Sequence, residues 1–452
     1  MTSAASTSQS SHPTRQRVTT FDHRFSAEAF LTQPRDVDEL RAILAHARAE
    51  RLVVKAVGAA HSFSDIALSE GYLVNLDHLS QVGEPQQDGS GWTIQVGAGV
   101  RLKDLNRALW QRGFALANMG EVAEQSIAGA TQTATHGSGE GGNSASGIVA
   151  MTLLTAEGRL MRLPNDDPEL FRAACVGLGA LGIVVDVTLR IQPRFYLEEV
   201  VTVRPFDEVV ASMPRLMAEH SRVRFRWMPH TKRAQISVLQ PTTKRPKRET
   251  LDPRAVSRLE LMGMNLLTRI GHAVPSFVPL SNRILGLTYL YREERSVDVS
   301  FRRFANGVGQ LLKPHEEIEY AVRPDEAGRA LEATRRLIEQ QRLKVNFPVE
   351  VRPVPADSNY MSYSYHRDVA CIGANSIQGR DANRFFRMFA ELMMREFNGL
   401  PHLGKDLVGV TPEYLRQVYG DGYVEFRRLR EQYDPDGLFA NDFVRRLFPT
   451  AA

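Results

Sequence analysis

Cysteine is scarce in this chain, with only Cys175 and Cys371 among 452 residues. Both are flanked by apolar residues. Two such thiols make neither a disulfide scaffold nor a cysteine-based zinc site, and they are typical of a reducing compartment. We therefore expect no resident metal ion and a cytoplasmic location.

Long apolar runs are also absent. No stretch of 18 consecutive apolar residues occurs, so we expect no membrane span. The first 20 residues are rich in Ser and Thr but lack the apolar core of a secretory signal. We expect residues 1–20 to form a disordered tail.

A large excess of one charge is missing as well. The 56 basic and 52 acidic residues leave a net charge of +4, which gives no reason to expect a nucleic-acid partner. The basic cluster at residues 244–248 is predicted to be a solvated loop. Length and a hydrophobic content of 43% indicate two globular domains.

Helix and strand patterns divide the chain into a first domain at residues 21–196, a second at 197–410, and a C-terminal segment at 411–452. In the first, Asp36 and Glu39 form a capping-box pattern that starts a helix. The second predicts a sheet with helices on one face. Its expected strands are Arg222–Trp227, Ala234–Leu239, Leu287–Tyr291, Val345–Val351 and Val369–Ala374, and its expected helices are Glu326–Gln340 and Asp381–Phe397.

The most informative stretch is Val54–Ile66, which reads VKAVGAAHSFSDI. A strand that runs into Gly58, Ala59 and Ala60 leaves consecutive backbone amides uncovered by side chains. Such amides form a concave nest for a diphosphate, and His61 closes the loop beside it. The alternative is a tight turn with an incidental histidine.

Residues Gly177–Gly182 match the dinucleotide pattern G-x-G-x-x-G. In a Rossmann unit this pattern follows a strand and opens a helix. Here a helical segment, Asp167–Cys175, precedes it and a β-rich run follows. We therefore expect no Rossmann NAD site; instead, the glycines let a loop pass close to a flat ligand.

A second small-residue segment runs from Asn118 to Gly139. It permits close backbone approach, and the hydroxyls of Ser126, Thr133 and Thr135 can bond polar ring edges or phosphate oxygens. A flexible linker is the alternative, although the alternating Thr and Ala residues favour an ordered ligand wall.

Taken together, V-G-A-A-H-S, S-I-A-G-x-x-x-T-A-T-H-G-S-G and G-A-L-G-I-V resemble the vanillyl-alcohol-oxidase-type FAD-binding domain. Further on, E-V-R, P-H-L-G-K and Y-D-P-D-G-L-F-A-N-D-F are similar to the sugar-lactone and alditol oxidase branch of that family. The resemblance runs from about residue 20 to the C-terminus. It implies an α+β two-domain flavoprotein, with a PCMH-type FAD-binding domain that the C-terminal segment completes and an α+β substrate (cap) domain.

The resemblance also implies roles for single residues. His61 occupies the position that bonds covalently to the flavin 8α carbon in many members, and Gly58, Ala59, Ala60 and Ser62 would hold the diphosphate. The other positions that match residues lining FAD are Ser126, Gly129, Thr133, Ala134, Thr135, His136, Val184 and His402.

Oxidation of a CH–OH group removes a hydride from carbon and a proton from oxygen, and a cation near that oxygen stabilises the developing charge. Arg352 and Lys405 match the cationic positions of the branch. Glu350 lies two residues from Arg352 on a predicted strand and shares its face, where it can bind substrate hydroxyls. The alternatives are a cross-strand ion-pair ladder and an ordinary surface lysine.

Two residues depart from the branch pattern. Leu403 replaces the usual tryptophan, and Glu121 replaces a serine that commonly contacts substrate, so that we expect added negative charge and a changed substrate pose. Gly120 lies near the position that the resemblance links to oxygen access, and a glycine leaves room for O₂.

These features predict an FAD-dependent oxidase of a polyol or aldonolactone that reduces O₂ to H₂O₂. The alternatives are a dehydrogenase with another acceptor, an oxidase of a non-sugar alcohol, and a flavin-binding protein without activity.

Overall fold

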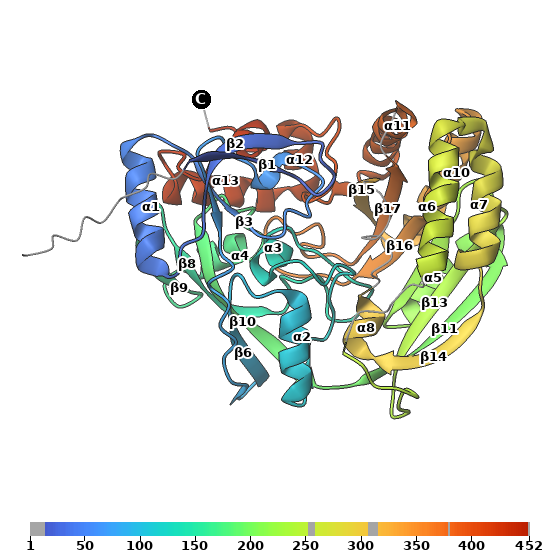
Figure 1. Cartoon of the computed structure of the whole chain (residues 1–452), viewed down its shortest axis with the longest axis horizontal. Helices are drawn as coiled ribbons and strands as arrows, with labels where there is room; N and C mark the ends of the chain where they lie inside the picture. The colour runs from blue at the N-terminus through green and yellow to red at the C-terminus, as the bar shows by residue number, and fades with distance from the viewer. Residues whose placement is uncertain (1–13, 252–257, 306–314, 378–379, 451–452) are drawn as a thin grey trace, which may run out of the picture.

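The computed structural model describes residues 14–251, 258–305, 315–377 and 380–450, which form three sheets with helices packed around them (Figure 1). We call residues 14–193 the N-terminal part and residues 196–401 the central part. The predicted α+β class is confirmed.

The first sheet of the N-terminal part has the order β1 (Arg15–Thr19), β2 (Ser26–Thr32), β4 (Tyr72–Asn75), β3 (Val54–Val57). The expected disorder is wrong for residues 15–19, because β1 pairs with β2 along its whole length. A local composition rich in polar residues does not reveal a strand that depends on its partner. Residues 1–13 lie outside the described residues.

Helix α1 (Val37–Ala49) follows the predicted cap. The Asp36 side chain accepts hydrogen bonds from the amides of Asp38 and Glu39, and Leu40, Leu44 and Ala47 are buried at helical spacing. Glu39 does not complete a capping box, because its carboxylate accepts the amide of Arg35 at 2.8 Å instead of the Asp36 amide.

The second sheet is antiparallel and carries the small-residue segments between its strands. Its order is β5 (Gln86–Asp88), β6 (Gly91–Gly97), β10 (Ile183–Pro193), β8 (Ile148–Leu154), β9 (Leu160–Leu163), with β7 (Phe114–Ala115) on β10. The accompanying helices are η1 (Asp65–Ala67), α2 (Leu102–Gln111), α3 (Ile127–Gln132) and α4 (Pro168–Ala174). As predicted, α4 precedes the Gly177–Gly182 loop and a strand follows it, so the order of a Rossmann unit is reversed.

The central part is built on one antiparallel sheet. Its order is β14 (Glu294–Val299), β11 (Tyr196–Pro205), β13 (Arg233–Thr242), β12 (Val223–Trp227), β16 (Val349–Val354), β17 (Val369–Ile377), β15 (His315–Val322), β18 (Leu400–Pro401). Helices α5 (Phe206–Glu219), α10 (Ala327–Gln340) and α11 (Arg380–Phe397) contact these strands, with η4 (Pro324–Glu326) before α10. These helices cover one face, and the other face turns toward the N-terminal part.

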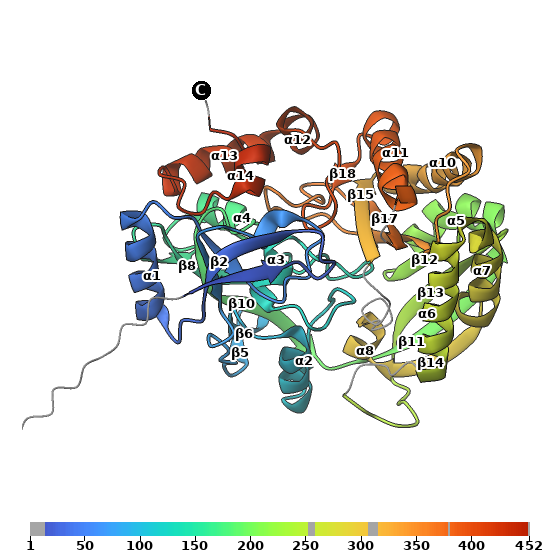
Figure 2. The same cartoon turned by 45° about the horizontal axis from the view of Figure 1, so that its top comes forward.

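A helical insertion joins β13 to β14. It contains α6 (Arg258–Ala273), η2 (Pro275–Phe277), α7 (Val278–Leu285) and the π-helical turn η3 (Gly286–Leu290), and α8 (Ser300–Phe304) follows β14. Helices α6 and α7 lie side by side in both views (Figures 1 and 2). The predicted strand Leu287–Tyr291 is therefore wrong, because a short apolar run does not distinguish a strand from the end of a packed helix.

The C-terminal helices α12 (Pro412–Tyr419), α13 (Asp421–Tyr433) and α14 (Asp442–Leu447) return to the N-terminal part (Figure 2). The Thr411 side chain accepts the Tyr414 amide and so caps α12. The Asn441 amide nitrogen donates to the carbonyls of Ile66 and Leu68, and the Val54 amide donates to Leu438. These bonds fix the last segment directly beneath the loop that contains His61.

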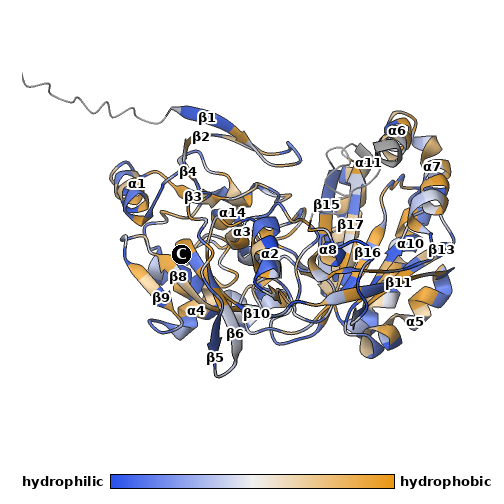
Figure 3. Cartoon of the chain, turned by 60° about the horizontal axis from the view of Figure 1, so that its bottom comes forward, coloured by the Kyte–Doolittle hydropathy of each residue, from blue (hydrophilic) through white to orange (hydrophobic). Residues whose placement is uncertain are grey.

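Apolar residues fill the interior, but several also lie at the surface of the α6–α7 insertion, where Figure 3 shows apolar colour along α7. Among the described residues, no helix combines the length and the apolar character needed to cross a membrane. Cys175 and Cys371 are buried free thiols.

Candidate active site

Two cavities meet at the loop that contains His61. The loop cavity, of about 100 Å³, lies between β3, α3 and the Gly177–Gly182 loop. The sheet cavity, of about 210 Å³, lies between the N-terminal part and the central sheet. His61, Ser62, Gln125 and Thr133 line both cavities, so a long ligand can extend from one into the other.

The backbone after β3 forms the predicted nest. Within the described chain, the amides of residues 58–62 make no hydrogen bond to protein, and Ala60 has a positive φ of 52°. A Cβ on Gly58 would overlap the Ser126 hydroxyl, so only glycine fits there. A run of unpaired amides in such a curved loop suits an anion such as a diphosphate.

Lys55 lies on the wall of the loop cavity, and it was not predicted from the sequence as a site residue. Its buried ammonium donates to the carbonyls of Leu178 and Gly179 at 3.0 and 2.8 Å, and to Phe439 at 3.5 Å. Burial lowers the pKa of Lys55 to about 7, and Asp434 opposes that shift. Lys55 thus ties β3 to the glycine loop and to the C-terminal segment.

Most of the predicted cofactor residues line one of the two cavities. The loop cavity is lined by Gly58, Ala59, Ala60, His61, Ser62, Ser126, Gly129, Thr133 and Val184. The sheet cavity adds Thr135, His136 and His402. Ala134 lies on neither wall, because it is buried beneath them and its carbonyl accepts the Tyr363 hydroxyl at 2.7 Å.

His61 lies where the two cavities meet. Its ring packs against Phe21, with 4.8 Å between ring centroids, and its side chain has no hydrogen bond among the described residues. Burial lowers the pKa of His61, and Arg101 and Lys405 lower it further while Glu124 opposes them. The neutral imidazole therefore prevails at neutral pH.

The open face of the central sheet supplies the polar wall of the sheet cavity. Strand register sets Arg226 opposite Glu350, Glu350 opposite Gly373, and Gly373 opposite Glu319. These four residues occupy one row across four strands and share a face. Arg226, Glu317 and Glu319 were missed from the sequence, although the alternation of Glu317 and Glu319 with apolar residues was a usable signal.

Arg352 is buried among carboxylates. Its Nε lies 3.5 Å from Glu350, and its Nη atoms lie 3.8 Å from Glu319 and 3.9 Å from Glu121. Burial alone would lower the pKa of Arg352, but Glu350 and Glu319 raise it above its ordinary value. Burial likewise opposes ionisation of Glu350, yet Arg226 and Arg352 lower its pKa to about 2. Both groups are charged at any working pH.

Glu319 links the two parts of the molecule. Its Oε1 lies 2.8 Å from His136 Nε2, and His136 Nδ1 donates to the Gly137 carbonyl at 2.9 Å. Burial pushes the pKa of Glu319 up, but His136 and Arg352 hold it well below its ordinary value. The carboxylate is therefore ionised between a ring from the N-terminal part and a guanidinium from the central sheet.

Glu121 does not add the uncompensated charge that we expected. Its Oε1 lies 3.0 Å from Arg226, 3.4 Å from Arg224 and 3.9 Å from Arg352. Three guanidinium groups share this one carboxylate, so its charge is compensated and Glu121 holds the arginines together.

Lys405 and His402 approach from the segment after β18. The Lys405 ammonium pairs with Glu317 and lies 5.0 Å from the centre of the Phe63 ring. His402 Nδ1 accepts the Gly404 amide at 3.1 Å. Burial lowers the pKa of His402 to about 3, with Glu319 opposing and Lys405 and His136 adding to the effect, so the ring is neutral.

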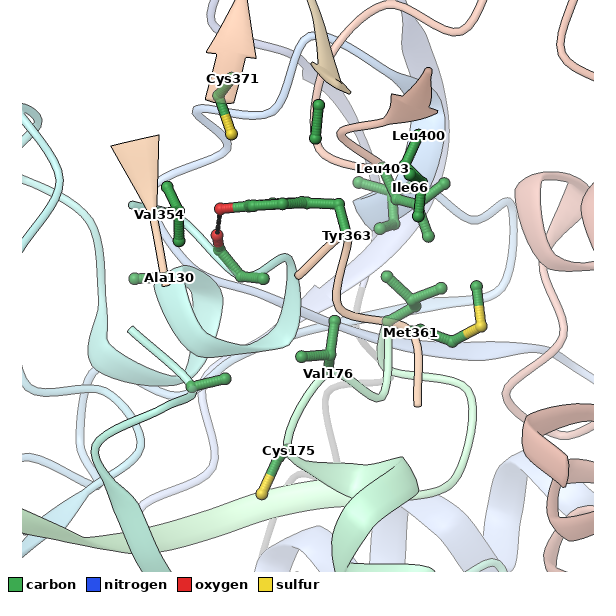
Figure 4. Close-up of a cluster of buried hydrophobic side chains, with 14 of the residues drawn as sticks. Ile66, Ala130, Cys175, Val176, Val354, Met361, Tyr363, Cys371, Leu400 and Leu403 are labelled. Atoms are coloured by element: carbon green, nitrogen blue, oxygen red, sulfur yellow. Dashed lines mark hydrogen bonds between the residues drawn. The ribbon is translucent and has the colours of Figure 1, made fainter. Parts of the chain in front are cut away.

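Leu403 and Gly120 do not face the cavity as the sequence suggested. Leu403 is 2% exposed and packs with Leu400 and Ile66 near one end of the Tyr363 side chain (Figure 4). Leu403 thus occupies a core position. At Gly120, a Cβ would overlap the Thr135 methyl group, so the glycine serves close packing and leaves no open gap.

His136, Glu319 and Cys371 offer ligand atoms within 4.8 Å of one another. Burial keeps the pKa of Cys371 well above its ordinary value. The Glu319 carboxylate already contacts His136 and Arg352. Glu319 and His136 thus already partner each other. The nest of unpaired amides suits the diphosphate of a dinucleotide that extends from the loop cavity to the sheet cavity.

The D-arabinono-1,4-lactone oxidase family model matches residues 187–447, and the FAD-binding domain model matches residues 29–164. L-gulono-1,4-lactone dehydrogenase of Mycobacterium tuberculosis H37Rv is 32% identical over 93% of this chain and 96% of its own. L-gulonolactone oxidase of Scyliorhinus torazame is 31% identical over 92% and 94%. The D-arabinono-1,4-lactone oxidase of Yarrowia lipolytica is 27% identical over 93% and 94%.

A solved cholesterol oxidase from B. sterolicum superposes with a TM-score of 0.83 over 96% of this chain and 97% of its own, at 18% identity. At that identity the likeness concerns the fold alone. The fold is therefore that of a two-domain flavoprotein, and the match to the FAD-binding domain model indicates FAD as the cofactor.

The link through Glu319 can be tested by Glu319→Gln, which keeps the shape and removes the charge. We expect this variant to lose about 3–5 kcal/mol of unfolding free energy, because the buried Arg352 guanidinium loses a counter-charge. Glu391→Gln breaks an exposed pair with Arg395 and should cost less than about 1 kcal/mol. Equal denaturant midpoints for the two variants would contradict the role of Glu319.

Proposed function

Because the chain belongs to the D-arabinono-1,4-lactone oxidase family, we propose that its sheet cavity binds an aldonolactone and presents a CH–OH group for oxidation. The protein is an FAD-dependent oxidoreductase. One observation carries the proposal: Arg352 and Glu350 lie on the wall of the sheet cavity, which shares His61 and Thr133 with the loop cavity.

FAD, when bound, supplies the acceptor for the hydride that leaves the substrate carbon. The amides of residues 58–62 would hold its diphosphate. Thr133, Thr135, His136 and His402 would surround the part of the cofactor that reaches the sheet cavity. In this proposal the N-terminal part holds FAD and the central part binds the substrate.

The chain's own contribution is electrostatic. As the carbon loses a hydride, negative charge develops on the hydroxyl oxygen, and a fixed cation in a buried site stabilises it strongly. Arg352 supplies that cation, because Glu350, Glu319 and Glu121 hold its guanidinium in place. Glu350 stays ionised and accepts hydrogen bonds from substrate hydroxyls, and the pair of Lys405 with Glu317 closes the cavity on the other side.

If Arg352 stabilises the developing charge, Arg352→Lys should slow the reaction, because lysine keeps the charge but loses the planar guanidinium group. We expect kcat/KM for an aldonolactone to fall about 10- to 100-fold, with the flavin content unchanged. Arg335→Lys alters a similar partly buried arginine on α10, paired with Glu332 and remote from both cavities, and should leave kcat/KM unchanged. An Arg352→Lys enzyme as active as wild type would exclude this role.

We propose further that His61 bonds covalently to FAD. Its neutral ring, its place on both cavity walls and its lack of a side-chain hydrogen bond among the described residues support this assignment. The covalent bond would retain the cofactor, while the backbone nest would bind it in the first place.

Acid precipitation of the purified yellow protein tests the bond. Wild type should keep its colour in the pellet, whereas His61→Ala should bind FAD and release it to the supernatant. His272→Ala, at an exposed position of α6, should behave as wild type. Release of FAD from the wild-type protein would disprove the covalent bond and leave the oxidoreductase assignment standing.

We propose O₂ as the electron acceptor. Relatives from Scyliorhinus torazame and Yarrowia lipolytica are named oxidases, which supports this choice. The second candidate is a dehydrogenase that passes electrons to another carrier, which the name of the Mycobacterium tuberculosis relative favours.

Stopped-flow reoxidation of the reduced flavin by O₂ separates these candidates. If O₂ is the acceptor, wild type should reoxidise far faster than free flavin. A wild-type rate like that of free flavin would favour the dehydrogenase.

A further inference from the structure

The sheet cavity has two chemically different walls. Opposite the charged face of the central sheet, the insertion between β13 and β14 contributes Met264 and Thr268 from α6, Leu285 from α7, and Tyr289 and Leu290 from η3. Met228, just after β12, joins them. Met228, Met264, Leu285 and Leu290 pack together as a separate apolar cluster away from the main core.

The polar groups of this apolar wall already have partners within the protein. The Thr268 hydroxyl donates to the carbonyl of Met264 at 2.6 Å, within its own helix. The Met228 amide donates to the Tyr291 hydroxyl at 3.0 Å, and the Leu290 carbonyl accepts the Gln235 side chain. Tyr289 lies near enough to Arg226 to act on its charge, and so marks the border between the two walls.

A fully hydroxylated substrate suits only half of this cavity. Hydroxyls turned toward Arg352, Glu350 and Lys405 would find partners. Hydroxyls turned toward Met264, Leu285 and Leu290 would lose water without replacing its hydrogen bonds, which is unfavourable. An apolar group there would gain from burial, and methionine side chains adapt readily to its shape.

We propose that the substrate is amphipathic: an aldonolactone or related polyol whose end remote from the oxidised CH–OH carries an apolar group of a few carbons. The hydroxylated head lies against Arg352 and Glu350, and the apolar end lies against the Met264–Leu290 wall. This inference rests on the proposed function, because it assigns the substrate class of the same site.

The test compares matched substrates on the flavin-loaded full-length enzyme. The probes are L-gulono-1,4-lactone and D-arabinono-1,4-lactone, and for each the butyl ether of its terminal hydroxyl. The measured quantity is the ratio of kcat/KM for ether and parent, from anaerobic bleaching of the flavin. We expect a ratio of about ten or more in favour of the ether for at least one pair.

Variants on two faces of α6 assign the preference to the apolar wall. Met264 is 9% exposed and lines the cavity, whereas Leu266 is 58% exposed on the outer surface. Met264→Asn should reduce the ratio severalfold, and Met264→Leu should preserve it. Leu266→Asn should show the wild-type ratio. Because each variant is compared with itself on two substrates, a change in its amount of folded enzyme cancels.

The outcomes distinguish a failure of this inference from a failure of the proposed function on which it rests. If the parent lactones reduce the flavin and every ratio is one or less, the amphipathic class is wrong and the lactone oxidation stands. A ratio that Met264→Asn leaves unchanged would also overturn the assignment to this wall. If neither parents nor ethers reduce the flavin, the proposed function is wrong and the inference fails with it.

Discussion

The buried carboxylate of Glu319 is the interaction on which the rest of the site depends. It lies between His136, which belongs to the small-residue segment of the N-terminal part, and Arg352, which belongs to the central sheet. An ionised group at this depth is stable only with its partners in place. The two parts of the molecule must therefore dock in one arrangement, and that arrangement brings the paired charges of the central sheet to the cavity that His61 borders.

The same logic explains the other charges on the wall. Glu121 and Glu350 between them contact Arg224, Arg226 and Arg352, so these carboxylates hold the arginines together and orient them. A guanidinium held in this way need not rearrange when charge develops on a substrate oxygen. On the far side, Lys55 and Asn441 hold the nest loop against the glycine loop and the C-terminal segment, so both ends of the cofactor site are fixed by buried polar contacts.

Local sequence predicted the features that depend on neighbours in the chain. The Asp36 cap, the Gly58–Ser62 loop and the shared face of Glu350 and Arg352 all follow from short-range geometry and are found as expected. Features set by long-range contacts were missed. Arg226 and Glu319 join the site through strand register, β1 is ordered by pairing with β2, and Leu287–Tyr291 continues a packed helix. Leu403 and Gly120 were given cavity roles because of their place in motifs, yet packing against Ile66 and Thr135 decides what they do.

Anaerobic titration of the purified flavoprotein with an aldonolactone tests the central claim most directly. We expect that the visible absorption of the flavin bleaches as lactone is added and that the lactone is recovered with its CH–OH oxidised to a carbonyl. A yellow, folded protein whose spectrum is unaltered by excess aldonolactones, their terminal ethers and polyols would contradict it.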